Sequence, residues 1–143
     1  MLTVNDLMTI IPNSVTPKTT VRRVIEVMKT QGCRQLPVLE SGRLVGIITD
    51  RDVRLVMNSP LVLHGRWQDE EILDHVMAES CMTPDPMTVA PNMPAYQAAN
   101  MLSVYKFGAL PVVDDGALVG IITVTDFLNY FAAQQPDPMD QNG

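Results

Sequence analysis

Two copies of one short pattern carry the residues that could do chemistry. Each copy is an apolar run that ends in a threonine, with an aspartate three residues later: Thr49 and Asp52 in the first, Thr123 and Asp126 in the second. At a strand-to-helix turn, the aspartate can accept hydrogen bonds from vicinal sugar hydroxyls, and the threonine with the free helix amides can meet a phosphate. The same spacing also resembles a capping box, which needs no ligand. For a single copy we would favour the cap; with both copies intact inside a recognisable pair of repeats, we favour the ligand-binding interpretation.

These turns belong to a longer internal repeat with a period of 74 residues. The shift aligns Met8-Thr9 with Met82-Thr83, Leu36-Pro37-Val38 with Leu110-Pro111-Val112, and Leu44 through Thr49 with Leu118 through Thr123. Matches of this length in one register indicate a duplication. The copies differ in charge, since Asp50-Arg51 corresponds to Val124-Thr125.

Each repeat predicts the order β-α-β-β-α. In the first, Val15 to Pro17 predicts a short strand that proline ends, and Thr19 or Thr20 caps a helix that stops at Gly32. Its apolar residues Val21, Val24, Ile25 and Met28 have helical spacing. Residues 36–39 and 44–49 predict a hairpin with its turn at 40–43, followed by a closing helix.

The fold class is therefore α+β, with two repeats of about fifty residues that are each too small to be stable alone. We expect the repeats to pack through their sheets with pseudo-two-fold symmetry. The predicted organisation is a first repeat at 1–58, a linker at 59–80, a second repeat at 81–133 and a flexible tail at 134–143. The linker predicts a turn at Ser59-Pro60 and a helix that carries Trp67, Ile72, Leu73, Val76 and Met77.

Composition excludes several classes of function. The net charge of −6 argues against a nucleic-acid partner, because such binding depends on phosphate neutralisation. No apolar run is long enough to span a membrane and no secretory signal is visible, so we expect a cytoplasmic protein. Cys33 and Cys81 predict reduced thiols, and His64 and His75 lack zinc-site spacing. No acid, base and nucleophile constellation indicates an enzyme.

The paired pattern resembles a tandem cystathionine beta-synthase (CBS) domain pair, or Bateman module, from about residue 5 to 132. The features that carry it are the Met-Thr opening, Val-x-Pro, Leu-Pro-Val and Gly-Ile-Ile-Thr-x-x-Asp in each copy. The resemblance implies a regulatory module that binds adenosine-containing ligands (AMP, ADP, ATP or S-adenosylmethionine) in clefts between two repeats. It also implies a homodimer that modulates a partner protein, here unidentified, with no required cofactor.

The resemblance further implies a set of binding residues. Thr49, Asp52, Thr123 and Asp126 would contact ribose and phosphate. The adenine would lie against the first strand and the segment before Leu-Pro-Val, which are Val15, Thr16, Pro17, Gln35 and Leu36 in one copy and Val89, Ala90, Pro91, Ala109 and Leu110 in the other.

Three arginines could supply the cations that phosphates need. Arg51 and Arg54 have uncharged counterparts in the second repeat, and Arg34 lies near the first predicted cleft. If Arg51 and Arg54 reach across, the site of Thr123 and Asp126 binds nucleotide better.

Two other interpretations remain open. The chain could be a structural dimerisation or protein-interaction module whose threonine and aspartate pairs only cap helices. It could also be an enzyme, which turnover of a bound nucleotide would reveal.

Overall fold

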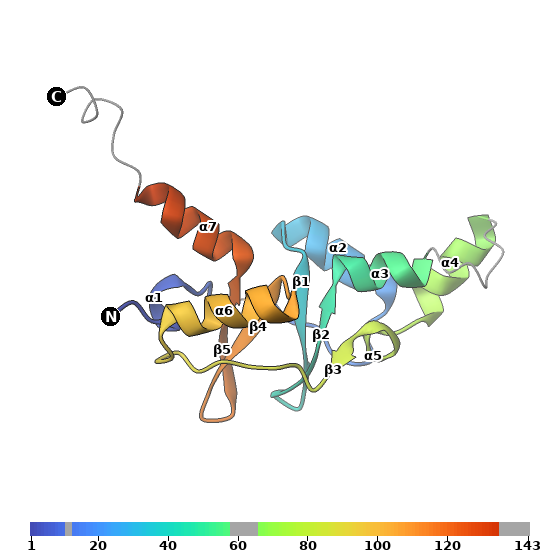
Figure 1. Ribbon diagram of the computed structural model, residues 1–143. Coiled ribbons are helices and arrows are strands. Elements are labelled where there is room, and N and C mark those ends of the chain that lie inside the picture. The colour runs from blue at the N-terminus through green and yellow to red at the C-terminus, as the bar shows by residue number, and fades with distance from the viewer. Residues whose placement is uncertain (11–12, 58–65, 135–143) are drawn as a thin grey trace, which may run out of the picture. The chain divides into compact units, whose positions relative to one another are not determined.

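The computed structural model describes residues 1–10, 13–57 and 66–134, and Figure 1 shows the order of its elements. The chain belongs to the mixed α+β class predicted from the sequence, with two repeats that each contain an antiparallel hairpin flanked by helices. The elements are α1 (Val4–Leu7), α2 (Val21–Gln31), β1 (Gln35–Glu40), β2 (Arg43–Thr49), α3 (Asp50–Met57), α4 (Arg66–His75), α5 (Ala78–Cys81), β3 (Thr83–Pro84), α6 (Ala95–Tyr105), β4 (Ala109–Asp114), β5 (Ala117–Thr123) and α7 (Val124–Ala133).

Local sequence signals explain the bounds of α2. The backbone N–H of Arg23 donates to the Thr20 hydroxyl, which satisfies a helix-start donor, and Gly32 ends the helix with a φ of 64°. Val21, Val24 and Met28 are buried on one face, as their spacing predicts. The predicted helix is therefore confirmed at both ends.

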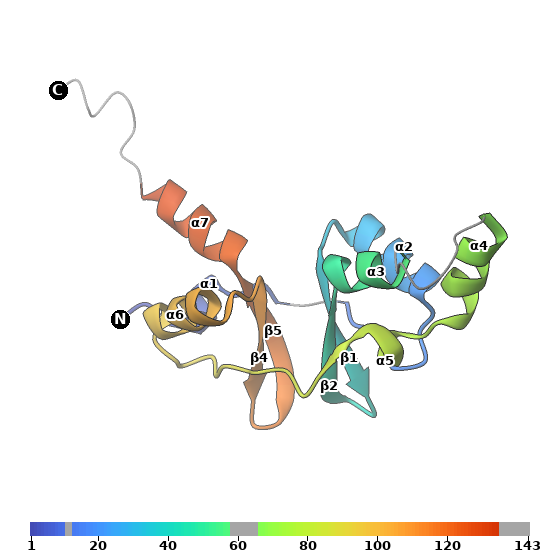
Figure 2. The ribbon, with the colours of Figure 1, turned by 45° about the vertical axis from the view of Figure 1, so that its right-hand side comes forward.

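The hairpin of β1 and β2 pairs Leu36 with Ile48 and Gln35 with Thr49. Its turn holds Ser41 and Gly42 at positive φ, the conformation that matches the twist of the two strands. Figure 2 shows α2 and α3 side by side along this hairpin, and the apolar core of the first repeat lies between the helices and the strands.

The segment at Val15 is not the strand that the sequence predicts. It forms a single parallel bridge with Val38, in which the Val15 N–H donates to the Pro37 carbonyl (3.0 Å) and the Leu39 N–H donates to the Val15 carbonyl (2.8 Å). Val89 forms the equivalent bridge with Val112. Proline two residues later has no N–H to continue the pairing.

The linker helix is also shorter than predicted. It ends at His75, because Met77 is extended and forms a bridge with Thr20, while the Val76 carbonyl accepts from the Val21 N–H. The predicted turn at Ser59-Pro60, the side chain of Trp67 and the tail beyond residue 134 lie outside the described part of the structure.

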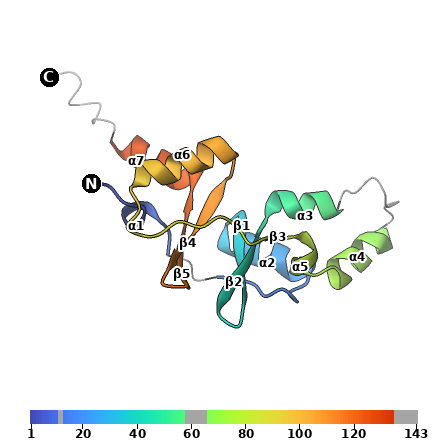
Figure 3. The same ribbon diagram turned by 60° about the horizontal axis from the view of Figure 1, so that its bottom comes forward.

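The opening segment of each repeat pairs with the last strand of the other repeat. Residues 1–10 belong to a compact unit with most of the second repeat, whereas 13–87 form the main part of the other unit. Thr9 bridges Ile121 of β5, and Thr83 of β3 pairs with Ile47 of β2, the strand beside β3 in Figure 3. The two openings are thus exchanged.

Glycine permits these close pairings. A Cβ on Gly120 would lie 2.8 Å from both the Met8 sulfur and the Thr9 carbonyl oxygen, and a Cβ on Gly46 would collide mainly with the Met82 side chain and lie 3.0 Å from the Thr83 carbonyl oxygen. Val4 of the exchanged segment is fully buried in the apolar core of the second repeat.

Across the described residues, no helix combines the length and hydropathy that membrane spanning requires.

Candidate ligand-binding turns

The first Thr-Asp turn (residues 49–52) joins β2 to α3. The Thr49 N–H donates to Asp52 Oδ2 (2.9 Å), and the Asp52 N–H donates to Thr49 Oγ1 (3.1 Å). These reciprocal bonds form a capping box, which satisfies donors at the start of α3. Both side chains are half-buried. Within the described residues, Asp52 Oδ1 has no hydrogen-bond partner.

The second Thr-Asp turn (residues 123–126) repeats this geometry between β5 and α7. The Thr123 N–H donates to Asp126 Oδ2 (2.8 Å), and the Asp126 N–H donates to Thr123 Oγ1 (3.0 Å). Here the second carboxylate oxygen is also engaged, because the Thr9 hydroxyl lies 3.1 Å from Asp126 Oδ1. The two turns therefore share a frame and differ in the environment of one oxygen.

A third threonine and aspartate pair shows what the spacing does on its own. Thr3 and Asp6 form a capping box at α1, with 2.8 Å from the Thr3 N–H to Asp6 Oδ2. Hydrogen bonds from the Thr3 backbone and then from its hydroxyl lower the pKa of Asp6. Capping is thus a property of all three pairs, and it leaves carboxylate lone pairs for other donors.

What separates the two Thr-Asp turns from the Thr3 pair is the chain beside them. The Asp50 N–H donates to the Arg34 carbonyl (2.9 Å), and Gln35 pairs with Thr49. In the second repeat, the Val124 N–H donates to the Gly108 carbonyl (3.1 Å). Each turn therefore lies against the segment that precedes Leu-Pro-Val, as the predicted site requires.

Most of the residues predicted to contact a base have buried side chains. The buried ones could meet a ligand through their backbone groups, which agrees with the predicted recognition of a base by main-chain atoms. The buried members are Val15, Pro17, Leu36, Val89, Ala109 and Leu110, the half-buried ones are Gln35, Ala90 and Pro91, and Thr16 is exposed. Their assignment to a binding site stays a prediction.

The predicted cations are exposed. Arg54 forms an ion pair with Asp50 one turn earlier in α3, at 3.8 Å, so part of its charge is compensated locally. Arg34 and Arg51 also have exposed side chains. Their predicted contact with phosphate stays a prediction.

Thr9 is the contact that sequence reasoning does not assign to the site. Its repetition as Met8-Thr9 and Met82-Thr83 is visible, but the repeat does not reveal which strand each opening pairs with. That pairing depends on packing between segments more than a hundred residues apart.

The cysteines show no sign of activation. Cys33 and Cys81 are free and half-buried, and burial raises the pKa of both thiols, with Asp52 adding to the effect at Cys81. No group of three histidine, cysteine or acidic side chains that could hold a metal ion occurs in the described ranges.

Comparison with known proteins decides the family. The CBS domain family matches residues 4–59 and again 78–133, which together are most of the chain. The chain belongs to the CBS domain family. The two matched segments contain the two Thr-Asp turns, one in each CBS repeat.

Several known proteins are similar to most of this chain. A CBS domain-containing protein of Dictyostelium discoideum is 34% identical over 113 residues, which are 78% of each chain. The inosine-5′-monophosphate dehydrogenase of Korarchaeum cryptofilum is 32% identical over 79% of this chain, which corresponds to only 21% of that enzyme. The crystal structure of CBSX2 in complex with AMP covers 95% of this chain and 100% of its own, with a TM-score of 0.78 and 30% identity.

Proposed function

We propose that this CBS pair is a regulatory module that binds an adenosine nucleotide at the two Thr-Asp turns and modulates a partner protein. The observation that carries the proposal is the duplicated turn, in which a capped aspartate keeps acceptor capacity beside the segment before Leu-Pro-Val. The similarity to an AMP-bound CBS protein along nearly the whole chain supports the choice of ligand.

The chemistry of the turn suits a ribose with a phosphate. An ionised carboxylate has about four lone-pair positions, and the cap uses one on Oδ2 of each aspartate. The remaining positions can accept hydrogen bonds from the two ribose hydroxyls. The amides at the starts of α3 and α7, together with the helix dipoles, favour a phosphate.

Calorimetric titration with AMP tests this function. We expect heat of binding for the wild type, loss of one binding event in Asp126→Ala and loss of the other in Asp52→Ala. Asp6→Ala is the matched control, because it removes the same kind of cap outside the predicted sites and should leave AMP binding unchanged.

The order of the two sites is part of the prediction. If Arg51 and Arg54 serve the second turn, Asp126→Ala removes the tighter event. Loss of binding only in Asp52→Ala would contradict that order. Flat titrations of the wild type with AMP, ADP, ATP, S-adenosylmethionine and NAD would contradict the proposed function as a whole.

Regulation requires more than binding. A ligand shifts an equilibrium only when it binds one arrangement of the protein more tightly than another. We therefore expect AMP to change either the hydrogen exchange of the helices or the self-association of the chain. The regulated partner would be a protein that binds the module differently with and without bound AMP.

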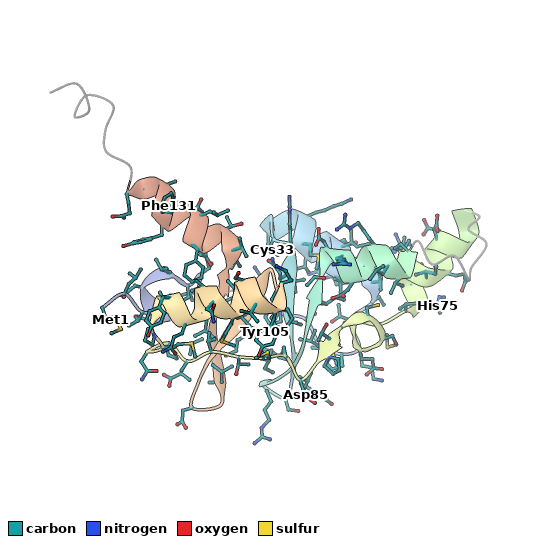
Figure 4. The ribbon with its side chains drawn as sticks, viewed as in Figure 1. Met1, Cys33, His75, Asp85, Tyr105 and Phe131 are labelled. Atoms are coloured by element: carbon teal, nitrogen blue, oxygen red, sulfur yellow. The ribbon has the colours of Figure 1, made fainter. Side chains whose placement is uncertain are left out.

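A second candidate function is a dimerisation or protein-interaction module. Its support comes from large apolar side chains that α6 and α7 leave exposed, which include Tyr96, Val104, Leu128 and Phe131. Figure 4 labels Phe131 on α7 and Tyr105 near the end of α6. Large apolar side chains exposed together on one surface often mark contacts with other proteins. Sedimentation of a homodimer together with flat nucleotide titrations would favour this candidate.

A further inference from the structure

We infer that Thr9 is a positioning residue that makes the second Thr-Asp turn the better-organised of the two ligand sites. The inference rests on the proposed function, and it assigns to the exchanged opening segment a direct effect on the site.

The backbone fixes Thr9 beside β5. Its N–H donates to the Ile121 carbonyl (2.8 Å), and the Ile121 N–H donates back to the Thr9 carbonyl (2.9 Å). Gly120 allows this approach, since a Cβ there would lie only 2.8 Å from the Thr9 carbonyl oxygen. Thr9 is therefore held in register two residues before Thr123, where the turn begins.

The Thr9 side chain completes the restraint on the aspartate. Its hydroxyl lies 3.1 Å from Asp126 Oδ1, while the Thr123 N–H holds Oδ2 at 2.8 Å. With one bond on each oxygen, the carboxylate plane is fixed before any ligand arrives, and each oxygen keeps a lone pair for a ribose hydroxyl. A fixed acceptor pair loses less entropy on binding than a rotating one.

The first repeat supplies an internal comparison. Thr83 occupies the equivalent backbone position, paired with Ile47 of β2. Its hydroxyl makes no hydrogen bond to Asp52 among the described contacts, so that carboxylate is held through Oδ2 alone. The two turns thus share the capping-box hydrogen bonds, but the carboxylate of Asp126 is held through both oxygens and that of Asp52 through one.

Site-resolved titration tests the inference. In an Asp52→Ala background, which leaves the second turn, we expect Thr9→Val to weaken AMP binding about 3- to 10-fold, the effect of one hydrogen bond. Valine keeps the β-branched shape that the bridge with Ile121 favours. Thr9→Ser restores the hydroxyl and should return affinity to within about twofold of the parent.

The matched control is Thr83→Val in an Asp126→Ala background, which leaves the first turn and should not change AMP affinity. The same AMP affinity with and without Thr9→Val in the Asp52→Ala background, or an equal loss with Thr83→Val, would overturn the inference. A loss that Thr9→Ser does not restore would also overturn it, because a purely structural role would then explain the effect.

Hydrogen exchange of the Thr123 amide tests the same inference without ligand. That N–H is held by Asp126 Oδ2, so a loosened carboxylate should speed its exchange in Thr9→Val but not in Thr9→Ser. Unchanged exchange of the Thr123 amide would overturn the positioning role. If the parent protein binds no AMP while this amide responds to Thr9→Val, the proposed function fails and the positioning role stands.

Discussion

At the scale of single residues, the two glycines before the Ile-Ile pairs decide whether an exchanged opening can pair with its strand. A Cβ on Gly120 would lie 2.8 Å from a backbone oxygen, that of Thr9, and backbone cannot rotate away. Gly46 faces mainly the flexible side chain of Met82, with the Thr83 carbonyl oxygen at 3.0 Å from the same Cβ position. The two positions should therefore tolerate a methyl group unequally.

We expect Gly120→Ala to lower the free energy of unfolding by about 1–3 kcal/mol, the usual range for overpacking, and Gly46→Ala to lower it less. Met82 can move where the Thr9 backbone cannot. Urea denaturation followed by circular dichroism measures both variants. Equal destabilisation would mean that Thr9 and β5 separate easily, in conflict with the close pairing described above.

At the scale of elements, an ion cluster attaches α4 to α2. The Arg22 guanidinium donates to Asp74 Oδ1 at 2.6 Å through Nε and also contacts Glu70, and both acids belong to α4. The hydrogen bond from Arg22 lowers the pKa of Asp74. A lowered pKa means that this attachment is present above the usual carboxyl range and is lost as the pH falls through the lowered value.

Arg22→Gln should therefore speed amide exchange in α4 at neutral pH and leave α2 nearly unchanged. Arg23→Gln is the matched control, because the ion pair that Arg23 forms among the described residues is within its own helix, with Glu26 at 3.2 Å. The difference between the variants should shrink in concentrated salt, which screens exposed charges. Hydrogen exchange followed by mass spectrometry measures the amide exchange rates in α4 of both variants. Equal rates would contradict the role of the ion cluster in attaching α4 to α2.

At the scale of the whole chain, the exchange of opening segments means that a change near the N-terminus acts on the second repeat. Val4 is fully buried with Val89, Leu110 and Ile122. Val4→Ala should cost roughly 1.5–3 kcal/mol, the transfer of two methyl groups plus the cavity. The loss should appear as faster amide exchange in β5, with β2 protected as before.

Ile10→Ala is the control for that experiment, since Ile10 lies in the same segment but is 76% exposed. Faster exchange in β2 rather than β5 after Val4→Ala would show that residues 1–10 stabilise their own repeat instead of the other one.

The exchange of opening segments between the repeats also marks the limit of what the sequence predicts for this chain. The cap at Thr20, the end at Gly32, the hairpin turn at Gly42 and the two capping boxes follow from contacts within a few residues, so periodicity and residue type predict them. The sequence predicts too long a strand at Val15, because pairing length depends on neighbours. The Thr9 contact joins residues distant in sequence, and a repeat cannot say which copy an opening will join.

The pairing of Thr9 with Ile121 also has a consequence for biosynthesis. At about 5–20 residues per second, a ribosome needs on the order of 5–20 s after finishing the opening segment to synthesise the strand that receives it. Val4 and its neighbours must stay uncommitted during that interval, although the first repeat's own hairpin is already complete. Residues 1–10 therefore stay exposed on the nascent chain until β5 emerges, which makes this segment a candidate substrate for chaperones.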